Sequence, residues 1–593
     1  MSAELKKDSV LLSTQHLARS TEAMRYLALA ADYDGTLATD GRVDAETVAG
    51  LEQLVASGRK LILVTGRQLD ELQEIFPQIA LCERVVAENG ALLYRPATRE
   101  QKVLGQAPPE SFVQALQARR VSPLSVGRSI VATFHPHETT VLEVIRDLGL
   151  ELQVIFNKGS VMVLPAGVNK ATGLTAALHE LGLSPHNVVG VGDAENDHAL
   201  LTLCECGVAV SNAVPMLKET ADLVTEKDHG AGVMQLIQEM VTHDLLHYED
   251  RLTRYHILLG TRDNGQEVRI SPYGHNLLLA GSSGSGKSTL ASGILERLSA
   301  EAYQFCIIDP EGDYESFEGA VTLGTSEHAP TVEEVLQLLD KPDVNAVVNL
   351  IGLPLHDRPA FFVGLLPRLQ ELRVKTGRPH WIVVDETHHL LPADWEPATL
   401  TLSQKSSSML FITVHPDQAA RAVLRDIDVV IALGDQPAET LRLFGKGRGE
   451  SLRPFPQTTL EPGEAVVWDP AVREDPFTIR IAPSKLDRKR HQRKYTEGEL
   501  PEERSFYFRG PEGKLSLRAQ NLMLFMQIGD GVDDATWMHH LKQGDYSRWF
   551  RERIKDDGLA EEVGLIERQP NLPPSESRRL IRAAIEKQYT LPA

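Results

Sequence analysis

The sequence predicts a multidomain α/β protein: a Rossmann-like domain with an α/β cap, a second parallel-sheet domain and a small, mostly helical C-terminal domain. Three observations predict this fold class. The chain has 593 residues, too many for a single hydrophobic core. Short apolar runs in its first quarter each end in polar residues, as the strands of an open α/β sheet do. Near the middle, a glycine-rich loop joins another apolar run to a helical pattern.

Composition limits the classes of function. The apolar fraction of 42% is typical of a folded protein, and the net charge of −21 argues against a broad nucleic-acid-binding surface. The first residues form no apolar signal core, and no apolar run is long enough to span a membrane. The cysteines are too few for a disulfide framework, so we expect a cytoplasmic protein without a membrane partner; they are Cys82, Cys204, Cys206 and Cys306.

The first domain is expected over residues 22–242. Its predicted strands include residues 26–31, 61–64 and 187–191, and a helix is expected to begin near Lys170. Carboxyl ends of parallel strands meet at one edge of a sheet, so the polar residues that follow them should share a crevice. These residues, with the lysine, are Asp32, Asp34, Thr65, Lys170, Asp193 and Asp197.

These residues form four motifs in chain order: Asp32 with Asp34, then Thr65, then Lys170, then Asp193 with Asp197. The motifs and their order resemble those of the haloacid dehalogenase (HAD) superfamily of phosphatases with an aspartate nucleophile. The resemblance implies that Asp32 forms an aspartyl-phosphate and that Asp34 is the general acid and base. It implies that Thr65 binds the transferring phosphoryl group and that Lys170 neutralises that group. Asp32, Asp34 (through its carbonyl) and Asp193 would hold Mg²⁺, and Asp197 would support the metal or Lys170. Phosphate esters hydrolyse very slowly unaided, so an enzyme that hydrolyses them needs such a concentration of charged groups.

Between the second and third motifs, residues 88–164 contain a predicted mixture of strands and helices. This insertion divides the core into residues 22–87 and 165–242, and it resembles the cap of HAD subfamily IIB. Relatives in that subfamily commonly hydrolyse sugar phosphates. The resemblance therefore implies a small phosphorylated substrate, whose selection would depend on the cap.

A second nucleotide-handling motif lies at residues 281–288, Gly-Ser-Ser-Gly-Ser-Gly-Lys-Ser, between an apolar run and a helical pattern. Glycines let such a loop direct its N–H groups at a polyphosphate. Lys287 would reach the terminal phosphates of ATP, and Ser288 would ligate Mg²⁺. The expected ATP-binding residues are Gly281, Ser282, Ser283, Gly284, Ser285, Gly286, Lys287, Ser288, Thr289 and Asp385.

Further predicted strands identify the kind of nucleotide site. One ends at Asp309, one at Asp385-Glu386, and one at Thr413. Asp385 would hold Mg²⁺ through water, and Glu386 would polarise the attacking water. Over residues 250–482 the pattern resembles the HerA–FtsK group of ATPases, which implies a homo-oligomer such as a hexameric ring. Candidates for an arginine donated between subunits are Arg421, Arg425, Arg442 and Arg448, and candidates for the polar sensor are Thr413, His415 and Gln418. His388 and His389 are expected to pack or to cap a helix.

The rest of the chain offers fewer signals. Residues 483–504 form a basic linker, and residues 505–593 are expected to form a helical accessory domain. Nucleic acid would bind at this linker or in a local basic pore. His539, His540 and Asp545 are expected to be polar residues on helix surfaces and not metal ligands.

The sequence thus predicts a Mg²⁺-dependent phosphatase fused to an ATP-hydrolysing HerA-like domain that couples to it or regulates it. Two alternatives stay open at this point. One is a nucleic-acid-directed ATPase, translocase or end-processing enzyme, in which the HAD domain dephosphorylates nucleic-acid ends. The other is a nucleotide-switched scaffold.

Overall fold

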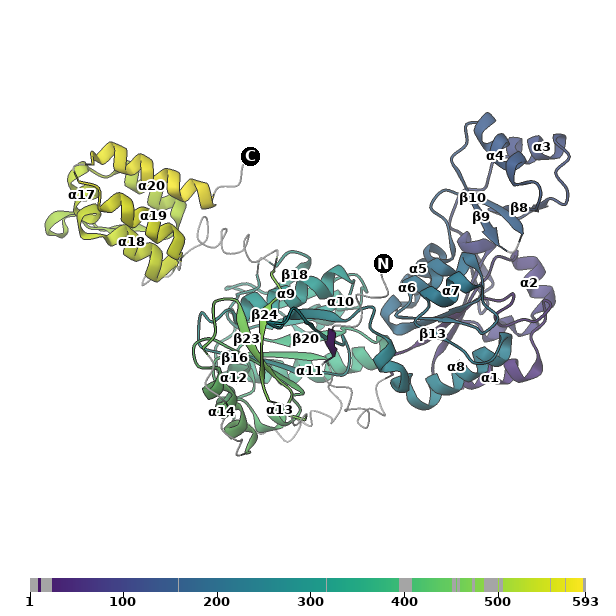
Figure 1. The fold of residues 1–593 in the computed structure, drawn as a ribbon, viewed down its shortest axis with the longest axis horizontal. Helices are drawn as coiled ribbons and strands as arrows, with labels where there is room; N and C mark the ends of the chain where they lie inside the picture. Colours follow the sequence, from purple (N-terminus) through teal and green to yellow (C-terminus); the bar gives the residue numbers. More distant parts are fainter. Residues whose placement is uncertain are drawn as a thin grey trace. The chain divides into compact units, whose positions relative to one another are not determined.

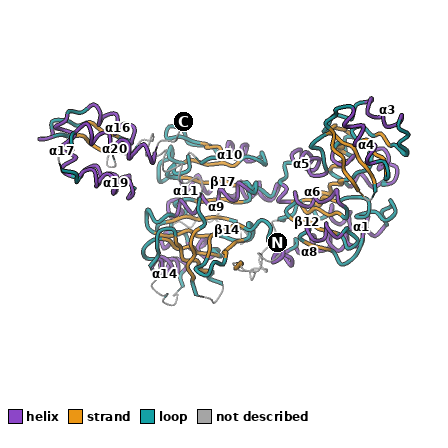
Figure 2. Tube along the Cα trace, turned by 45° about the horizontal axis from the view of Figure 1, so that its top comes forward, coloured by secondary structure: helices purple, strands orange, loops and turns teal. Residues whose placement is uncertain are grey.

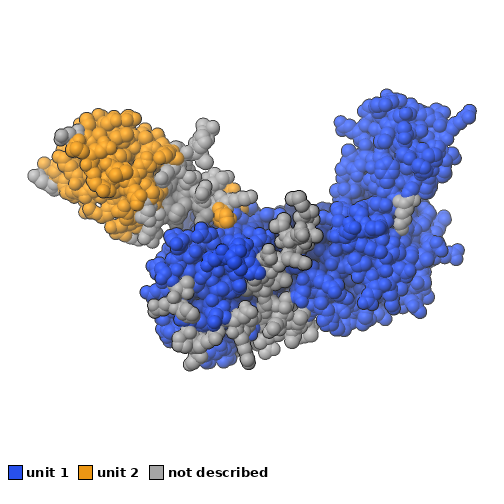
Figure 3. All heavy atoms as spheres, in the orientation of Figure 1, with its two compact units in different colours: residues 1–315, 319–482 blue, residues 316–318, 483–593 orange. Residues whose placement is uncertain are grey.

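The computed structural model describes residues 9–11, 24–157, 159–315, 317–393, 408–450, 455, 459–471, 475–484, 500, 505–554, 556–570 and 572–589. The chain forms two compact units, one of residues 1–315 with 319–482 and one of residues 316–318 with 483–593 (Figure 3). The first unit contains both predicted α/β domains. The basic run at residues 485–494 of the expected linker lies outside the described residues.

The first domain is built on an eight-stranded sheet in the order β13-β12-β11-β2-β3-β4-β5-β6. Strands β13 to β4 of that order are parallel, and β5 and β6 extend the sheet as an antiparallel pair. Central strands are buried on both faces, which explains their uninterrupted apolar sequences. The bounds are β2 Ala28–Ala31, β3 Lys60–Val64, β4 Arg84–Ala87, β5 Leu92–Arg95, β6 Glu100–Val103, β11 Val188–Gly192, β12 Cys206–Ala209 and β13 Leu223–Val224.

Helices cover both faces of this sheet, with α1 and α8 packed together on one face and α5, α6 and α7 on the other (Figure 1). Helix α5 begins with a capping box in which Asn169 and Thr172 satisfy each other's backbone N–H groups. This cap determines where Lys170, the first helical residue, stands. The bounds are α1 Ala45–Ala56, α2 Leu69–Ile75, α5 Lys170–Leu181, α6 His198–Leu203, α7 Pro215–Thr220 and α8 His229–His243.

The cap has its own antiparallel sheet in the order β7-β8-β10-β9, packed against two helices through Phe112, Leu116, Val141 and Val144. The strand pair that follows Ala91, which the sequence places in the cap, instead extends the core sheet as β5 and β6. Strand β5 pairs with β4 and β6 pairs with β5, and this pairing is invisible in a local pattern. The bounds are α3 Glu110–Ala118, β7 Ser125–Val126, β8 Val131–Phe134, α4 Glu138–Asp147, β9 Leu152–Asn157 and β10 Ser160–Pro165.

The second domain contains a twelve-stranded sheet in the order β1-β15-β14-β24-β23-β22-β16-β21-β20-β17-β19-β18. Its strands from β22 to β18 are parallel and are flanked by helices (Figure 2). The strand bounds are β1 Ser9–Leu11, β14 Ile257–Thr261, β15 Glu267–Ile270, β16 Leu277–Gly281, β17 Phe305–Asp309, β18 Ala320–Leu323, β19 Asn345–Asn349, β20 Trp381–Val384, β21 Met409–Thr413, β22 Val429–Leu433, β23 Glu464–Trp468 and β24 Phe477–Ile481. The helix bounds are α9 Lys287–Ala300, α10 Val332–Leu339, α11 Arg358–Thr376, α12 Thr387–Leu390, α13 Arg421–Arg425 and α14 Pro437–Arg448.

The second unit is helical around an aromatic core that includes Phe506, Phe525, Trp537 and Tyr546. It also contains a two-stranded ribbon of β25 (Phe506–Phe508) and β26 (Leu517–Ala519). The helix bounds are α16 Leu522–Gly531, α17 Asp534–Gln543, α18 Asp545–Trp549, α19 Asp557–Glu567 and α20 Pro574–Tyr589. In the described part of the chain, no helix combines the length and the apolar character needed to cross a membrane.

Candidate active sites

Three neighbouring strands place the predicted phosphatase residues at one edge of the first sheet. Strand β2 lies between β3 and β11, and its last residue, Ala31, is opposite Leu63 and Val191. Asp32, Thr65 and Asp193 follow the ends of these strands and are all buried. The expectation of a shared crevice therefore agrees with the register of the sheet.

Lys170 lies at the centre of this crevice and joins two carboxylates. Its ammonium group donates to Asp32 Oδ1 and to Asp197 Oδ1, both at 2.6 Å, and it is 1% exposed. A positive charge in the first turn of a helix opposes the helix dipole, so these carboxylates must stabilise it. Burial lowers the pKa of Lys170, but the charges of Asp197 and Asp32 outweigh burial and hold that pKa above its usual value.

Asp197 organises the loop after β11. Its Oδ2 atom accepts the backbone N–H groups of Asp193 and Ala194, both at 3.0 Å, while its Oδ1 atom accepts Lys170. Gly192 is required beside it, because a Cβ atom there would lie 2.5 Å from the Asp197 carboxyl carbon. These contacts fit the support of Lys170 better than direct ligation of a metal.

The residues present fit a divalent cation. Ligand atoms of Asp32, Asp193 and Asp197 lie within 4.8 Å of one another, and all three side chains are buried. Three carboxylates and one ammonium group leave two negative charges uncompensated, which a divalent cation would offset. The same excess explains why burial and the charge of Asp197 raise the pKa of Asp32 to about 8 despite the nearby Lys170.

Asp34 pairs with a residue to which the sequence analysis assigned no role. The Arg67 guanidinium donates to both carboxylate oxygens of Asp34, at 2.6 and 2.7 Å, and it also pairs with Glu71. Arg67 follows Thr65 in the second motif, and its own backbone N–H donates to the Thr65 hydroxyl. The strand-end position of Arg67 is the signal that could have identified it.

Glu88 connects the core to the cap and was also missed. Its carboxylate is buried and accepts the backbone N–H groups of Arg128, Ser129 and Ile130 in the cap. Next to it, Asn89 accepts a hydrogen bond from Asn196, which lies in the loop that carries Asp193 and Asp197. Glu88 thus attaches the cap to a core segment that is itself bonded, through Asn89, to the loop that closes the carboxylate cluster.

The glycine-rich loop connects β16 to α9, as the sequence predicts. Gly281 lies against β22, because a Cβ atom there would be 2.3 Å from the Leu433 carbonyl oxygen. Gly284 and Gly286 have φ values of 78° and 92°, a region that favours glycine. The Lys287 ammonium group donates to the carbonyls of Gly281 and Ser282, both at 2.9 Å.

Acidic residues end the strands beside the loop. Asp385 and Glu386 follow β20, and Asp309 ends β17, the strand paired with β20. Asp309 accepts backbone N–H groups of Glu311, Asp313 and Tyr314, so it shapes its own loop. Burial, with the charges of Asp309 and Glu386, raises the pKa of Asp385 well above its usual value. Burial and the charge of Glu311 raise the pKa of Glu386 to about 7, although Lys287 lowers it.

Strand β21, which ends at Thr413, lies between the strands that end in the glycine-rich loop and in Asp385. Among the three sensor candidates, Thr413 is fully buried, and its hydroxyl is 3.0 Å from His388 Nδ1. His388 in turn lies 3.3 Å from the Glu386 carboxylate. His388 therefore connects Glu386 with Thr413. This is a more specific role than the packing or helix capping expected from sequence.

The other predicted residues differ in how far they are exposed. Arg421, Arg425 and Arg442 are exposed, and Arg448 is half-buried. In the second unit, His540 is buried and both of its ring nitrogens are engaged, with Asp545 and with the backbone N–H of Arg509. The burial of His540 differs from the helix-surface position expected from sequence, because its ring packs against the aromatic core at Phe506.

A buried polar seam joins the two domains of the first unit. Glu205 accepts hydrogen bonds from Arg25 (2.6 Å) and Tyr303 (2.8 Å), and its carboxylate lies 2.6 Å from His186 Nδ1. His186 Nε2 contacts the Glu301 carbonyl, and the His186 ring stacks on Tyr303 at 3.7 Å. His186 lies just before β11, which leads to Asp193, and Tyr303 lies just after α9, which begins at Lys287. The seam thus contacts one element from each site.

Comparisons with known proteins match both domains of the first unit. Residues 29–143 and 142–237 match the family model of the haloacid dehalogenase-like hydrolases, and residues 266–362 match that of the helicase HerA central domain. A phosphoglycolate phosphatase of Methanothermobacter thermautotrophicus is 31% identical over 229 residues, which are 36% of this chain and 98% of that protein. Phosphoglycolate phosphatase 2 of Saccharolobus solfataricus is 27% identical over 221 residues, 36% of this chain and 93% of that protein.

Among solved structures, a haloacid dehalogenase-like hydrolase from Bacteroides thetaiotaomicron is 18% identical, with a TM-score of 0.33, and the match covers 36% of this chain and 100% of that one. The family models and the phosphatase relatives, taken with the Lys170 cluster, identify the chemistry of the first domain. The chain belongs to the haloacid dehalogenase-like hydrolases as a phosphoric monoester hydrolase that also carries a HerA-type central domain.

Proposed function

We propose that the first domain is a Mg²⁺-dependent phosphatase of small phosphorylated metabolites that acts through an aspartyl-phosphate. The observation that carries this proposal is the buried Lys170 bonded to both Asp32 and Asp197. Lys170 lowers the pKa of the Asp32 nucleophile against the opposing effects of burial and Asp197, and its positive charge also attracts a phosphoryl group. Mg²⁺, held by Asp32, Asp193 and the Asp34 carbonyl, would supply the charge that offsets the excess of carboxylates.

The proposed reaction has two steps. Asp32 attacks phosphorus while the bond to the leaving oxygen breaks, and Asp34 delivers a proton to that oxygen. Asp34, now ionised, then removes a proton from the water that displaces phosphate from Asp32. Arg67 pairs with both Asp34 oxygens, so we infer that this pair must loosen before Asp34 can act as an acid.

The cap limits the size of the substrate. Because Glu88 attaches the cap to the core, next to Asn89 and its bond to the loop of the carboxylate cluster, a polymer end would have to displace these contacts. We therefore favour small substrates over nucleic-acid ends. Phosphoglycolate, on which relatives with this domain are named to act, and sugar phosphates are the first compounds to test.

We propose that the second domain binds and hydrolyses ATP. Phosphate oxygens would take over the Lys287 ammonium group from the Gly281 and Ser282 carbonyls, and Ser288 with Asp385 would hold the accompanying Mg²⁺. Glu386 would activate water, with His388 and Thr413 orienting it. Exposed Arg421 and Arg425 would be the arginines donated to a neighbouring subunit in a homo-oligomer, which native mass measurement would detect.

We also propose that the two sites are coupled through the seam of Glu205, His186 and Tyr303. The support is positional, because a shift of α9 when the loop binds ATP would act on His186 and hence on β11. We further propose that the protein acts in the cytoplasm, because its free, buried cysteines suit a reducing compartment.

Phosphate release from phosphoglycolate, sugar phosphates and ATP, with and without DNA, tests these proposals on wild type, Asp32→Asn and Lys287→Ala. We expect Asp32→Asn to lose only phosphomonoester hydrolysis and Lys287→Ala to lose ATP turnover. Retained phosphatase activity in Asp32→Asn would refute the catalytic assignment. Stimulation of ATP turnover by DNA would favour a nucleic-acid motor instead. Sustained ATP turnover would exclude the nucleotide-switched scaffold.

A further inference from the structure

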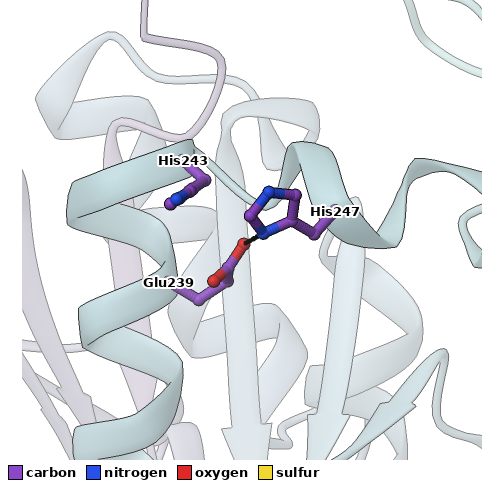
Figure 4. Close-up of side chains that lie close together, drawn as sticks. All are labelled: Glu239, His243 and His247. Carbon is purple, nitrogen blue, oxygen red and sulfur yellow. Dashed lines mark ion pairs between the residues drawn. The ribbon is translucent and has the colours of Figure 1, made fainter. Parts of the chain in front are cut away.

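A second group of metal-binding side chains lies at the end of α8, away from the predicted phosphatase residues. Glu239 and His243 stand one turn apart on one face of that helix. The chain then reverses through Asp244 and Leu245, both with left-handed backbone, into a short 3₁₀ helix, Leu246–Arg251. This reversal brings His247 back over the last turn of α8, so that the three side chains converge (Figure 4).

The contacts within this cluster leave two buried acceptors unsatisfied. His247 Nδ1 lies 2.9 Å from Glu239 Oε1, and the His243 and His247 rings are 4.1 Å apart. Neither Glu239 Oε1 nor His243 Nδ1 is exposed to solvent, and among the described residues neither has a partner in good hydrogen-bond geometry. Buried polar atoms normally find such partners, so both atoms are available to a bound cation.

The neighbouring acidic side chains already have partners and do not compete for a cation at this cluster. Asp244 is bonded to Arg59, and Glu249 is bonded to Arg25 and Ser271. The C-terminal end of α8 adds the negative end of its dipole beside His243, which favours a cation. One carboxylate and two imidazoles suit Zn²⁺ and similar transition metals, whereas Mg²⁺ and Ca²⁺ prefer oxygen ligands alone.

We propose that Glu239, His243 and His247 form a binding site for a transition-metal ion of the Zn²⁺ class, with water in the fourth position. The ligand atoms lie within 4.8 Å of one another, and tetrahedral binding needs separations of roughly 3.4 Å, which side-chain rotation can supply. The ion ties the segment Leu246–Arg251 to α8, and this segment leads directly into the second domain. The site is independent of the phosphatase and ATPase sites.

Metal titration of the full-length chain tests the site. The protein is freed of metal with a chelator, supplied with excess Mg²⁺ to occupy the Asp32 cluster, and titrated with Co²⁺ or Zn²⁺. We expect one equivalent of Co²⁺ to give the absorption of a tetrahedral complex, and Zn²⁺ to displace it. His243→Gln and His247→Gln should each weaken binding by more than about 100-fold, because they remove a direct ligand. His179→Gln, at an exposed histidine on α5, is the matched control and should bind as wild type does.

A second measurement separates metal loss from misfolding. Without metal, His247→Gln and wild type should unfold at the same temperature, because His247 is 61% exposed. Zn²⁺ should then raise the unfolding temperature of wild type and slow hydrogen exchange in residues 244–251, but do neither in His247→Gln. Equal Zn²⁺ affinities of wild type, His243→Gln and His247→Gln would overturn the proposal.

Discussion

Tyr303→Phe tests the seam between the two domains with the loss of a single hydroxyl group. Tyr303 is buried, and its hydroxyl donates to Glu205 Oε2 at 2.8 Å. The substitution keeps the ring that stacks on His186, so packing should change little. Glu205 keeps Arg25 and His186 as partners, which limits the damage.

The expected cost follows from the charge of the acceptor. A hydrogen bond to a charged group contributes about 1.5–3 kcal/mol, which corresponds to an opening equilibrium roughly 10- to 150-fold larger. Tyr273→Phe provides a graded comparison, because that hydroxyl donates to the His186 carbonyl, a neutral acceptor, at 3.1 Å. Loss of this hydroxyl should cost about 0.5–1.5 kcal/mol, which corresponds to an opening equilibrium roughly 2- to 12-fold larger.

Hydrogen–deuterium exchange followed by mass spectrometry measures this opening locally. The informative amides are those of Asn187, bonded to Ser184, and of Glu205, bonded to Pro185. Tyr303→Phe should speed their exchange more than Tyr273→Phe does, and Tyr507→Phe, in the other unit, should leave it unchanged. If the sites are coupled, a non-hydrolysable ATP analogue should also change exchange at these amides in wild type. Unaltered exchange in Tyr303→Phe would refute the assigned strength of the seam.

Three further predictions concern the two sites. Lys170→Met leaves Asp32 and Asp197 buried without their cation, so it should destabilise the domain by about 3–5 kcal/mol. Mg²⁺ should restore part of that loss in thermal unfolding, and a variant as stable as wild type would contradict the pairing. Because the pKa of Glu386 is raised to about 7, kcat/KM for ATP should rise with pH up to that value and level off above it. Glu386→Gln should lower turnover by roughly 10²–10⁴-fold. An unchanged pH profile in that variant would exclude Glu386 as the base. Gly281→Ala should separate β16 from β22, cost about 1–3 kcal/mol and weaken ATP binding, whereas Gly364→Ala, where a Cβ atom meets nothing within 4 Å, should not.

Much of the fold was predictable because its signals are local. The apolar run before Asp32 and the run before Gly281 are buried strands in the structure, as predicted. The strand pair β5 and β6 was placed in the cap because its hairpin pattern does not show which sheet it joins. Only pairing with β4 assigns it to the core.

The roles of site residues were less predictable than their positions. Arg67 stands in a motif, but its pairing with Asp34 depends on how two separate loops meet at the sheet edge. Glu88 has no motif of its own and is recognised only by the three cap N–H groups that it accepts. Such contacts join distant parts of the chain, so they leave no periodic pattern.

The sequence alone determined which chemistry this chain carries. A glycine-rich loop that ends in Lys287 and the acidic strand end at Asp32 are contiguous stretches, and their chemistry requires those residue types at that spacing. The tertiary structure alone decided which groups meet: Lys170 with Asp197, Glu205 with Tyr303, and His247 with Glu239. The reason is physical, because a side-chain contact a few ångströms long depends on strand register, helix caps and chain reversals that pack together only in the folded protein.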